Sequence, residues 1–378
     1  MGRSFARTAL IIYVLLASRG IPVFGEFIDP FVMPSARSGA LGGTHAAFGD
    51  DFYILFTNPA ALFDAEEEFS AAEITLNMYG PVFELIDILT DRPDNTIDIS
   101  GIVGPRGFAS GFDMGGPLAL GWIGRRLGVG VFNRTRVEGV VTGTVIRPII
   151  SEEILFLGGY SFRFLEKQSH VLDAGFIGKG FYRGTINMES SVFNVTNMGV
   201  PADNPFTTNL GMGFDLGLRY TFAGSFSAAL VCYDAYSPAM VTTHGSFSQW
   251  GDDSDPAKSG SYATVKPRLD VGVAYKVRSG FLERYISNFV VMADYQDFLD
   301  MISLIPRNPI LNVGIGAELV VLNVLSLRAG IADALPALGF GLNLKFITLD
   351  FAIHGKELGL DPGVQSVYEI DIGLLFRY

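Results

Sequence analysis

The sequence has few charged residues, one cysteine and, after residue 25, no long apolar run. Only 17% of its 378 residues are charged and 49% are hydrophobic, which is too apolar for a typical soluble protein. A helical membrane protein is excluded as well, because a spanning helix needs about 18 or more consecutive apolar residues. The single cysteine, Cys232, cannot form an internal disulfide. The formal net charge of −12 argues against nucleic acid as a partner, since binding phosphates needs a basic surface.

The N-terminus has the pattern of an export signal. Positively charged residues precede an apolar stretch at residues 9–17, and Val23, Phe24 and Gly25 are acceptable at the positions that a signal peptidase recognises. Nine apolar residues are too few to span a membrane as a helix. We therefore expect residues 1–25 to be a cleaved signal peptide, although cleavage after Gly20 fits the same pattern.

Apolar residues alternate with polar ones or glycine through most of the chain after residue 66. In residues 209–222 every second residue is apolar, whereas the intervening positions include Asn209, Asp215 and Arg219. The same alternation recurs at residues 268–276, 311–319 and 338–346. Alternation over about ten residues with the charges on one face is typical of a membrane-spanning strand. The predicted fold class is therefore all-β, a closed antiparallel transmembrane β-barrel.

Fourteen strands are predicted, an even number as a closed bacterial barrel requires. We place them at residues 67–79, 106–124, 126–136, 153–164, 169–184, 209–222, 225–237, 266–277, 286–297, 309–321, 324–332, 336–346, 347–355 and 366–378. If both ends of the chain are periplasmic, most short connections lie inside and the long ones, at 80–105, 186–208 and 238–265, lie outside. That asymmetry is typical of outer-membrane barrels, so residues 67–378 are assigned to the barrel.

The last predicted strand ends in aromatic residues. Phe376 and Tyr378 continue a row of apolar residues that starts at Tyr368, and Glu369 and Asp371 lie on the other face. A terminal aromatic residue on an alternating strand resembles the recognition signal of outer-membrane barrels in Gram-negative envelopes. Phe376 and Tyr378 are therefore the expected assembly signal, the barrel assembly machinery and outer-membrane lipid are expected partners, and the outer membrane is the expected location.

Residues 26–66 lack the alternating pattern and form a separate segment. Within it, Asn58, Pro59 and Ala60 predict a capped helical turn, with asparagine as the N-cap and proline at the first helical position. The charges of the barrel's inward face have both signs, so we expect them to pair across the interior and to hold this segment.

The N-terminal segment resembles the FadL-type superfamily of transporters for long-chain fatty acids and other hydrophobic compounds, which also includes the barrel subunit of type IX secretion. The resemblance rests on Ser38-Gly39-Ala40, Gly42-Gly43, Ala46-Ala47, Asp50-Asp51 and Asn58-Pro59-Ala60. It implies that residues 26–66 fold into the lumen as a plug inside a fourteen-stranded barrel. It also implies that an apolar ligand enters from an outer groove and leaves sideways at a kinked strand beside the plug.

Two stretches are candidates for that route. Phe83, Leu85, Ile86 and Leu89 suit a short amphipathic helix whose apolar face forms the outer groove, or one that merely caps the barrel mouth. Gly115, Gly116 and Pro117 interrupt an alternating strand and predict a kink or bulge, because proline cannot donate to the ladder and glycine weakens it. That kink is either a lateral gate or a simple bend.

The predicted function is passive import of hydrophobic molecules such as long-chain fatty acids across the outer membrane. The four histidines are scattered and no catalytic motif or metal-ligand cluster occurs, so neither an enzyme nor a cofactor is expected. A plugged scaffold or secretion-associated barrel, a general porin and a surface adhesin are the alternatives. The sequence alone names neither the ligand nor the oligomeric state.

Overall fold

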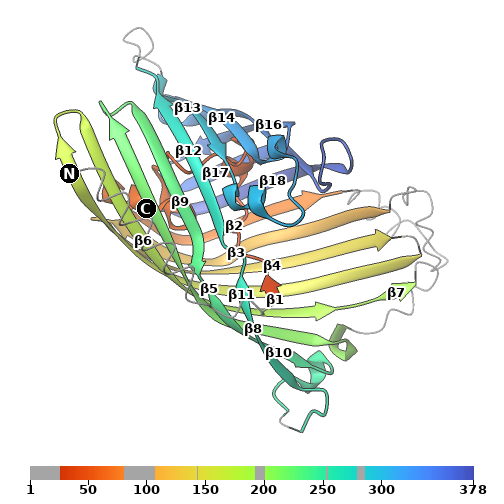
Figure 1. The fold of residues 1–378 in the computed structure, drawn as a ribbon. Helices are drawn as coiled ribbons and strands as arrows, with labels where there is room; N and C mark the ends of the chain where they lie inside the picture. The colour runs from red at the N-terminus through yellow and green to blue at the C-terminus, as the bar shows by residue number, and fades with distance from the viewer. Residues whose placement is uncertain (1–25, 81–106, 143, 192–200, 253, 279–285) are drawn as a thin grey trace.

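One closed antiparallel sheet dominates the structure (Figure 1). The computed structural model describes residues 26–80, 107–142, 144–191, 201–252, 254–278 and 286–378. Its barrel strands are β2 (Glu68–Tyr79), β3 (Phe108–Gly124), β4 (Leu127–Thr142), β5 (Val145–Lys167), β6 (His170–Asn187), β8 (Phe206–Phe222), β9 (Phe226–Tyr236), β10 (Pro238–His244), β11 (Ser259–Val265), β12 (Arg268–Lys276), β13 (Ile286–Tyr295), β14 (Val313–Val321), β15 (Leu325–Ala332), β16 (Leu335–Asn343), β17 (Ile347–Glu357) and β18 (Ser366–Arg377).

The first and last of these strands close the barrel. β18 pairs with β2 in an antiparallel ladder, from Glu369 opposite Tyr79 to Arg377 opposite Ser70. β9 and β10 are two halves of one strand, and so are β11 and β12, which gives fourteen strands across the described residues. The predicted fold class and strand number are confirmed. Two short strands join the barrel at its margins: β1 (Glu26–Ile28) pairs in parallel with β11, and β7 (Ser190–Ser191) pairs with β5.

The predicted long connection at residues 238–265 is wrong in its extent. β10 and β11 occupy both of its ends and pair with each other from Pro238–Thr264 to Thr243–Ser259. The remaining loop covers residues 245–258 and contains η5 (Phe247–Gln249). The pattern of alternation missed these strands because serine and threonine stand on both faces, whereas β-branched residues such as Thr242 and Thr264 still favour an extended backbone.

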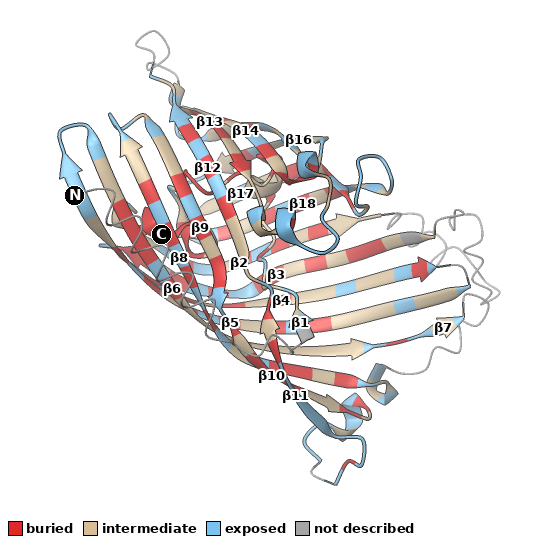
Figure 2. Ribbon diagram, viewed as in Figure 1, coloured by how far each residue is buried: buried red, intermediate tan, exposed pale blue. Residues whose placement is uncertain are grey.

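Burial alternates along the strands, as the alternating sequence predicted (Figure 2). On β8, Leu210, Met212 and Leu216 are exposed on the outward face, whereas Asp215 and Arg219 are buried on the inward face. The outward face is therefore apolar and the inward face carries the charges. No helix among the described residues is both long and apolar enough to cross a membrane.

The N-terminal segment packs against the inward face of the barrel (Figure 1). It contains α2 (Ala36–Ala40), η1 (Phe52–Phe56) and η2 (Pro59–Phe63). Barrel glycines let its backbone approach closely: a Cβ added at Gly330 would lie 2.6 Å from the backbone nitrogen of Gly42, and one added at Gly314 would lie 2.5 Å from the Gly42 oxygen. Gly42 has a φ of +68°, which a side chain rarely tolerates.

Candidate functional site

Asn58 holds the second turn of the N-terminal segment against the wall. Its side-chain oxygen accepts a hydrogen bond of 2.9 Å from the Ala60 amide, and its side-chain nitrogen donates to the Ala46 carbonyl at 2.7 Å. Pro59 packs so closely on Gly175 and Gly217 that a Cβ at either glycine would overlap the turn. The three residues of the predicted motif therefore fix the position of η2 beside β6 and β8.

Arg37 on α2 ties the N-terminal segment to the opposite side of the barrel. Its guanidinium lies 2.8 Å from Asp50, 2.7 Å from Asp51 and 2.5 Å from Glu318 on β14. Glu318 is almost fully buried and also pairs with Arg328 at 2.7 Å. One cation thus joins two carboxylates of the segment to one of the wall. Sequence reasoning did not single out Arg37, because Glu318 lies 281 positions away.

A second anchor lies at His45. The backbone amides of His45 and Ala46 both donate to the carboxylate of Asp294 on β13, at 2.7 and 2.9 Å. The His45 ring nitrogen Nε2 lies 2.9 Å from the Tyr233 hydroxyl. These contacts hold the segment against β9 and β13, so polar contacts link it to several separate parts of the wall.

β3 is irregular at Gly115, Gly116 and Pro117. On one side, pairing with β2 stops at Thr75–Gly115 and resumes at Ser70–Gly121. On the other side, Gly115 pairs with Arg134 and Ala119 with Phe132, so residues 116–118 lie opposite Asn133 alone. We call this interruption between the two strands, formed by residues 71–74 of β2 and 116–120 of β3, the ladder gap.

The sequence explains why the interruption lies here. Gly116 has a φ of +89°, and a Cβ at this position would overlap the carbonyl oxygen of Glu73. Pro117 has no amide hydrogen to donate to either neighbour. The strand therefore cannot continue as a regular ladder through these two residues.

The N-terminal segment covers the ladder gap from the inside. A Cβ at Gly115 would lie 2.7 Å from the terminal methyl of Met33, and one at Gly121 would lie 2.5 Å from the Phe52 ring. The Tyr53 hydroxyl bridges the Pro34 carbonyl, at 3.1 Å, and the Glu73 carboxylate. Side chains of the segment thus fill the inner side of the wall where backbone pairing is missing.

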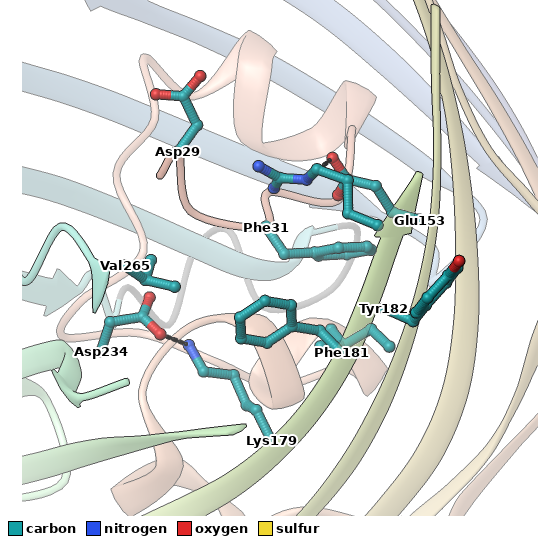
Figure 3. A pocket seen from close by; sticks show the side chains of 10 residues that line it. Asp29, Phe31, Glu153, Lys179, Phe181, Tyr182, Asp234 and Val265 are labelled. Carbon is teal, nitrogen blue, oxygen red and sulfur yellow. Dashed lines mark ion pairs between the residues drawn. The ribbon is translucent and has the colours of Figure 1, made fainter. Parts of the chain in front are cut away.

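A small cavity lies between the N-terminal segment and β5, β6 and β11 (Figure 3). The rings of Phe31 and Phe181 lie on either side of it, with Leu155 and Val265 completing the apolar lining. Its volume is about 10 Å³, room for about one water molecule. Lys179 also lines the cavity, but its ammonium pairs with Asp215 at 2.8 Å and with Asp234 at 2.7 Å.

Aromatic rings connect this cavity to the ladder gap. Phe31 lies against Phe56, with ring centroids 6.4 Å apart, and Phe56 meets Phe132 at 4.7 Å. Phe132 then lies 5.7 Å from Phe52, which packs at the edge of the gap. Residues from both ends of this row belong to one apolar cluster, which also includes Met33 and Phe181. Sequence reasoning missed this row because its members come from two separate segments.

Aromatic side chains also gather at the end of the barrel that carries the loop 245–258. Phe206, Phe247 and Trp250 form a cluster with centroid distances of 5.0 to 6.0 Å, and Trp250 is 52% exposed. The sequence feature that could have predicted this cluster is Trp250, a tryptophan within the polar stretch 245–258. The groove predicted at Phe83, Leu85, Ile86 and Leu89 lies outside the described residues, as does the predicted signal peptide at 1–25.

The predicted assembly signal lies at the seam of the barrel. Tyr378 and Phe69 exchange two backbone hydrogen bonds, at 2.7 and 2.8 Å, next to the last residue of β18. The Tyr378 ring stacks on Phe346 with centroids 5.9 Å apart, and both Tyr378 and Phe376 are exposed. The aromatic face of the closing strand is therefore outward.

Two solved structures of transport proteins share this architecture. The Ralstonia pickettii toluene transporter TbuX matches with a TM-score of 0.50 at 15% identity, over 91% of this chain and 98% of that one. The monoaromatic hydrocarbon channel CymD matches with a TM-score of 0.50 at 13% identity, over 93% and 98%. The chain has the fold of these hydrocarbon channels. The barrel fold that the resemblance implied is thus confirmed.

Other comparisons define how distant these similarities are. A Pseudomonas aeruginosa FadL homologue matches with a TM-score of 0.48 at 11% identity, over 94% of this chain and 99% of that one. No protein-family model matches the sequence. No curated protein matches it either. Within the described residues there is no group of three or more histidine, cysteine, aspartate or glutamate side chains arranged to hold a metal ion.

Proposed function

We propose that this chain is an outer-membrane channel for the passive import of hydrophobic molecules. The apolar outward face suits contact with lipid, as expected of a membrane barrel. The fold shared with a toluene transporter and a monoaromatic hydrocarbon channel supports the same function. The observation that carries the proposal is the row of aromatic rings from the cavity at Phe31 to the ladder gap.

Both apolar and charged side chains face the interior. Apolar side chains of β3 to β5, including Ile123, Phe132 and Leu155, pack in one cluster with the N-terminal segment. The same wall also carries the largely buried ion pairs Arg134–Asp113 and Arg183–Glu153. Ion pairs line β14 to β18, where Arg328 joins Glu318 and Asp350. An open pore for ions would need a continuous water-filled lumen, whereas the N-terminal segment packs against the inward face of this barrel and forms ion pairs with it. The arrangement favours a plugged channel with an apolar route along one wall.

The proposed exit is the ladder gap. A hydrophobic molecule that moves from an apolar cavity into the bilayer keeps its apolar surface away from water, whereas release into the periplasm would expose that surface to water at a cost in free energy. At the gap, the backbone ladder between β2 and β3 is interrupted, and Phe52 packs against its inner side. Movement of Met33 and Phe52 would open a lateral path into lipid.

The lining of the cavity, which would have to widen around a ligand, favours neutral molecules over fatty-acid anions. The ammonium of Lys179 is already paired with two aspartates, the guanidinium of Arg183 is paired with Glu153, and Asp29 also lines the cavity. A carboxylate ligand would therefore meet a surplus of negative charge, which destabilises it in a site of low dielectric. We expect toluene and alkanes to be imported more readily than laurate.

A thiol-labelling experiment tests the lateral exit. Leu118→Cys places a thiol on the exposed side of the gap, in a Cys232→Ala background that removes the natural thiol. Modification with N-phenylmaleimide, a neutral reagent that enters the bilayer, should reduce uptake of radiolabelled toluene by whole cells to the level of cells lacking the protein. The matched control is Leu218→Cys, which is equally outward-facing but lies on β8.

Two outcomes would contradict the proposal. Unchanged toluene uptake after complete labelling of Leu118→Cys would remove the gap from the route. Equal inhibition through Leu218→Cys would show that the label acts on the barrel as a whole. A large ion conductance in planar bilayers would instead favour a porin.

A further inference from the structure

Two adjacent glutamates of β5 face opposite sides of the wall. Glu153 faces the interior, where it lies 2.6 Å from Arg183 and 3.9 Å from Arg134. Glu152 is exposed on the outward face, in a row with Ile150, Ile154 and Phe156. None of the ion pairs among the described residues includes Glu152. A carboxylate thus interrupts the apolar surface of the barrel without a cation beside it.

Glu152 belongs to a small polar cluster that reaches the ladder gap. Its carboxylate accepts a hydrogen bond of 2.9 Å from the Asn133 side-chain nitrogen and another from the Thr135 hydroxyl. The Asn133 side-chain oxygen accepts the backbone amide of Leu118 at 2.9 Å. Asn133 therefore satisfies an amide that the interrupted ladder leaves without a strand partner, and Glu152 orients Asn133.

This structural role does not explain the charge of Glu152. A glutamine at the same position would accept the same hydrogen from Asn133 without the free-energy penalty of an ion among apolar neighbours. A carboxylate has about four lone-pair sites, of which the two contacts use two, so acceptor capacity remains. An ionisable group among apolar side chains on the outward face indicates a functional partner, and that partner has to supply a hydrogen-bond donor.

We propose that Glu152, Asn133 and Thr135 form an exterior site that binds the ammonium or hydroxyl group of an otherwise apolar molecule. The apolar part of the ligand lies along Leu118 and Phe156, and its donor group meets the free acceptor sites of Glu152. The proposal rests on the proposed function in one respect. If a molecule leaves sideways through the ladder gap, this site is the first part of the outward face that it contacts. It extends the substrate class to amphiphilic amines and alcohols.

Binding to purified protein in detergent tests the site without transport. Equilibrium dialysis compares radiolabelled dodecylamine, dodecanol and dodecane on the unmodified protein, Glu152→Gln and Glu152→Leu. Hydrogen bonds to charged groups are stronger than neutral ones, so Glu152→Gln should weaken dodecylamine binding about tenfold and dodecanol binding only a few-fold. Glu152→Leu should remove the contribution of the donor group for both ligands. Dodecane binding should not change. Glu166→Gln, the same substitution at the far end of β5, is the matched control.

A protection assay locates the bound ligand. In the Leu118→Cys, Cys232→Ala background, saturating dodecylamine should slow thiol labelling, and Glu152→Leu should abolish that protection. The proposal is overturned if all three ligands respond equally to Glu152→Gln, because that outcome indicates a change in the gap itself. It is also overturned if Glu166→Gln has the same effect. Protection without any toluene uptake would contradict the import function and leave the site standing.

Discussion

Replacing Arg37 by methionine tests whether buried charge holds the N-terminal segment inside the barrel. Methionine keeps most of the side-chain volume and removes the cation that Asp50, Asp51 and Glu318 share. The Arg37 side chain is 18% exposed and that of Glu318 is 1% exposed. The pair is therefore largely withdrawn from water. The loss of one partner destabilises a buried pair more than an exposed one.

The expected magnitude follows from burial and from the remaining partners. Loss of one member of a buried ion pair destabilises by about 3–5 kcal/mol, because the other charge stays buried without compensation. Glu318 keeps Arg328 at 2.7 Å, so we expect the lower end, about 3 kcal/mol. Arg125→Met provides the contrast: its pair with Glu67 is 82% and 54% exposed, and such surface pairs contribute about 1 kcal/mol or less.

The assay is guanidinium unfolding of the refolded barrel in detergent, followed by tryptophan fluorescence. Arg37→Met should lower the unfolding midpoint clearly, and Arg125→Met should hardly move it. The double variant Arg37→Met, Glu318→Gln should recover part of the loss, because it removes the uncompensated carboxylate. Equal effects of Arg37→Met and Arg125→Met would refute the reasoning, since they would show that the buried network adds nothing.

The pH dependence of the same variant gives a second measurement. Burial alone raises the pKa of Asp51, but Arg37 and Arg377 outweigh it and hold the pKa below its ordinary value. A lowered carboxyl pKa stabilises the folded state above the unfolded-state pKa of about 4, and this contribution is lost as the pH falls through the folded-state value. In Arg37→Met the pKa of Asp51 should rise, so acid unfolding should begin at a higher pH.

Three further predictions concern topology, assembly and the ladder gap. An epitope inserted beside Ser254, an exposed residue of the 245–258 loop, should be labelled on intact cells, whereas one at the turn after Lys167 should need permeabilisation; labelling of the second site on intact cells would reverse the orientation. Replacing Phe376 and Tyr378 by aspartate should stall insertion, because the closing strand loses its aromatic outward face, and normal surface levels would contradict this role. Gly116→Ala should destabilise the barrel, because a Cβ at φ +89° overlaps the Glu73 carbonyl, whereas Gly139→Ala, with no atom within 4 Å, should not. Similar unfolding midpoints for the two alanine variants would show that the gap accepts a regular residue.

The sequence by itself determined the features that depend on local pattern. Alternation with period two specifies which side chains of β8 face outward. It also indicates the number of strands, because each alternating segment corresponds to one strand with an apolar outward face. The cap at Asn58 and the irregularity at Gly116 and Pro117 follow from the chemistry of single residues. Where polar residues stand on both faces, as in β10 and β11, the pattern is missing and the strand ends were misplaced.

The tertiary structure alone decided which residues meet across the barrel. Arg37 finds Glu318 281 positions away, and Phe31 joins Phe181 around one cavity, because strand register and closure bring them together. The charge of Glu152 is visible in the sequence, but its place beside Asn133 and the Leu118 amide depends on the pairing of β3, β4 and β5. Side-chain alternation is set within a strand, whereas these contacts are set by the shear and closure of the whole sheet.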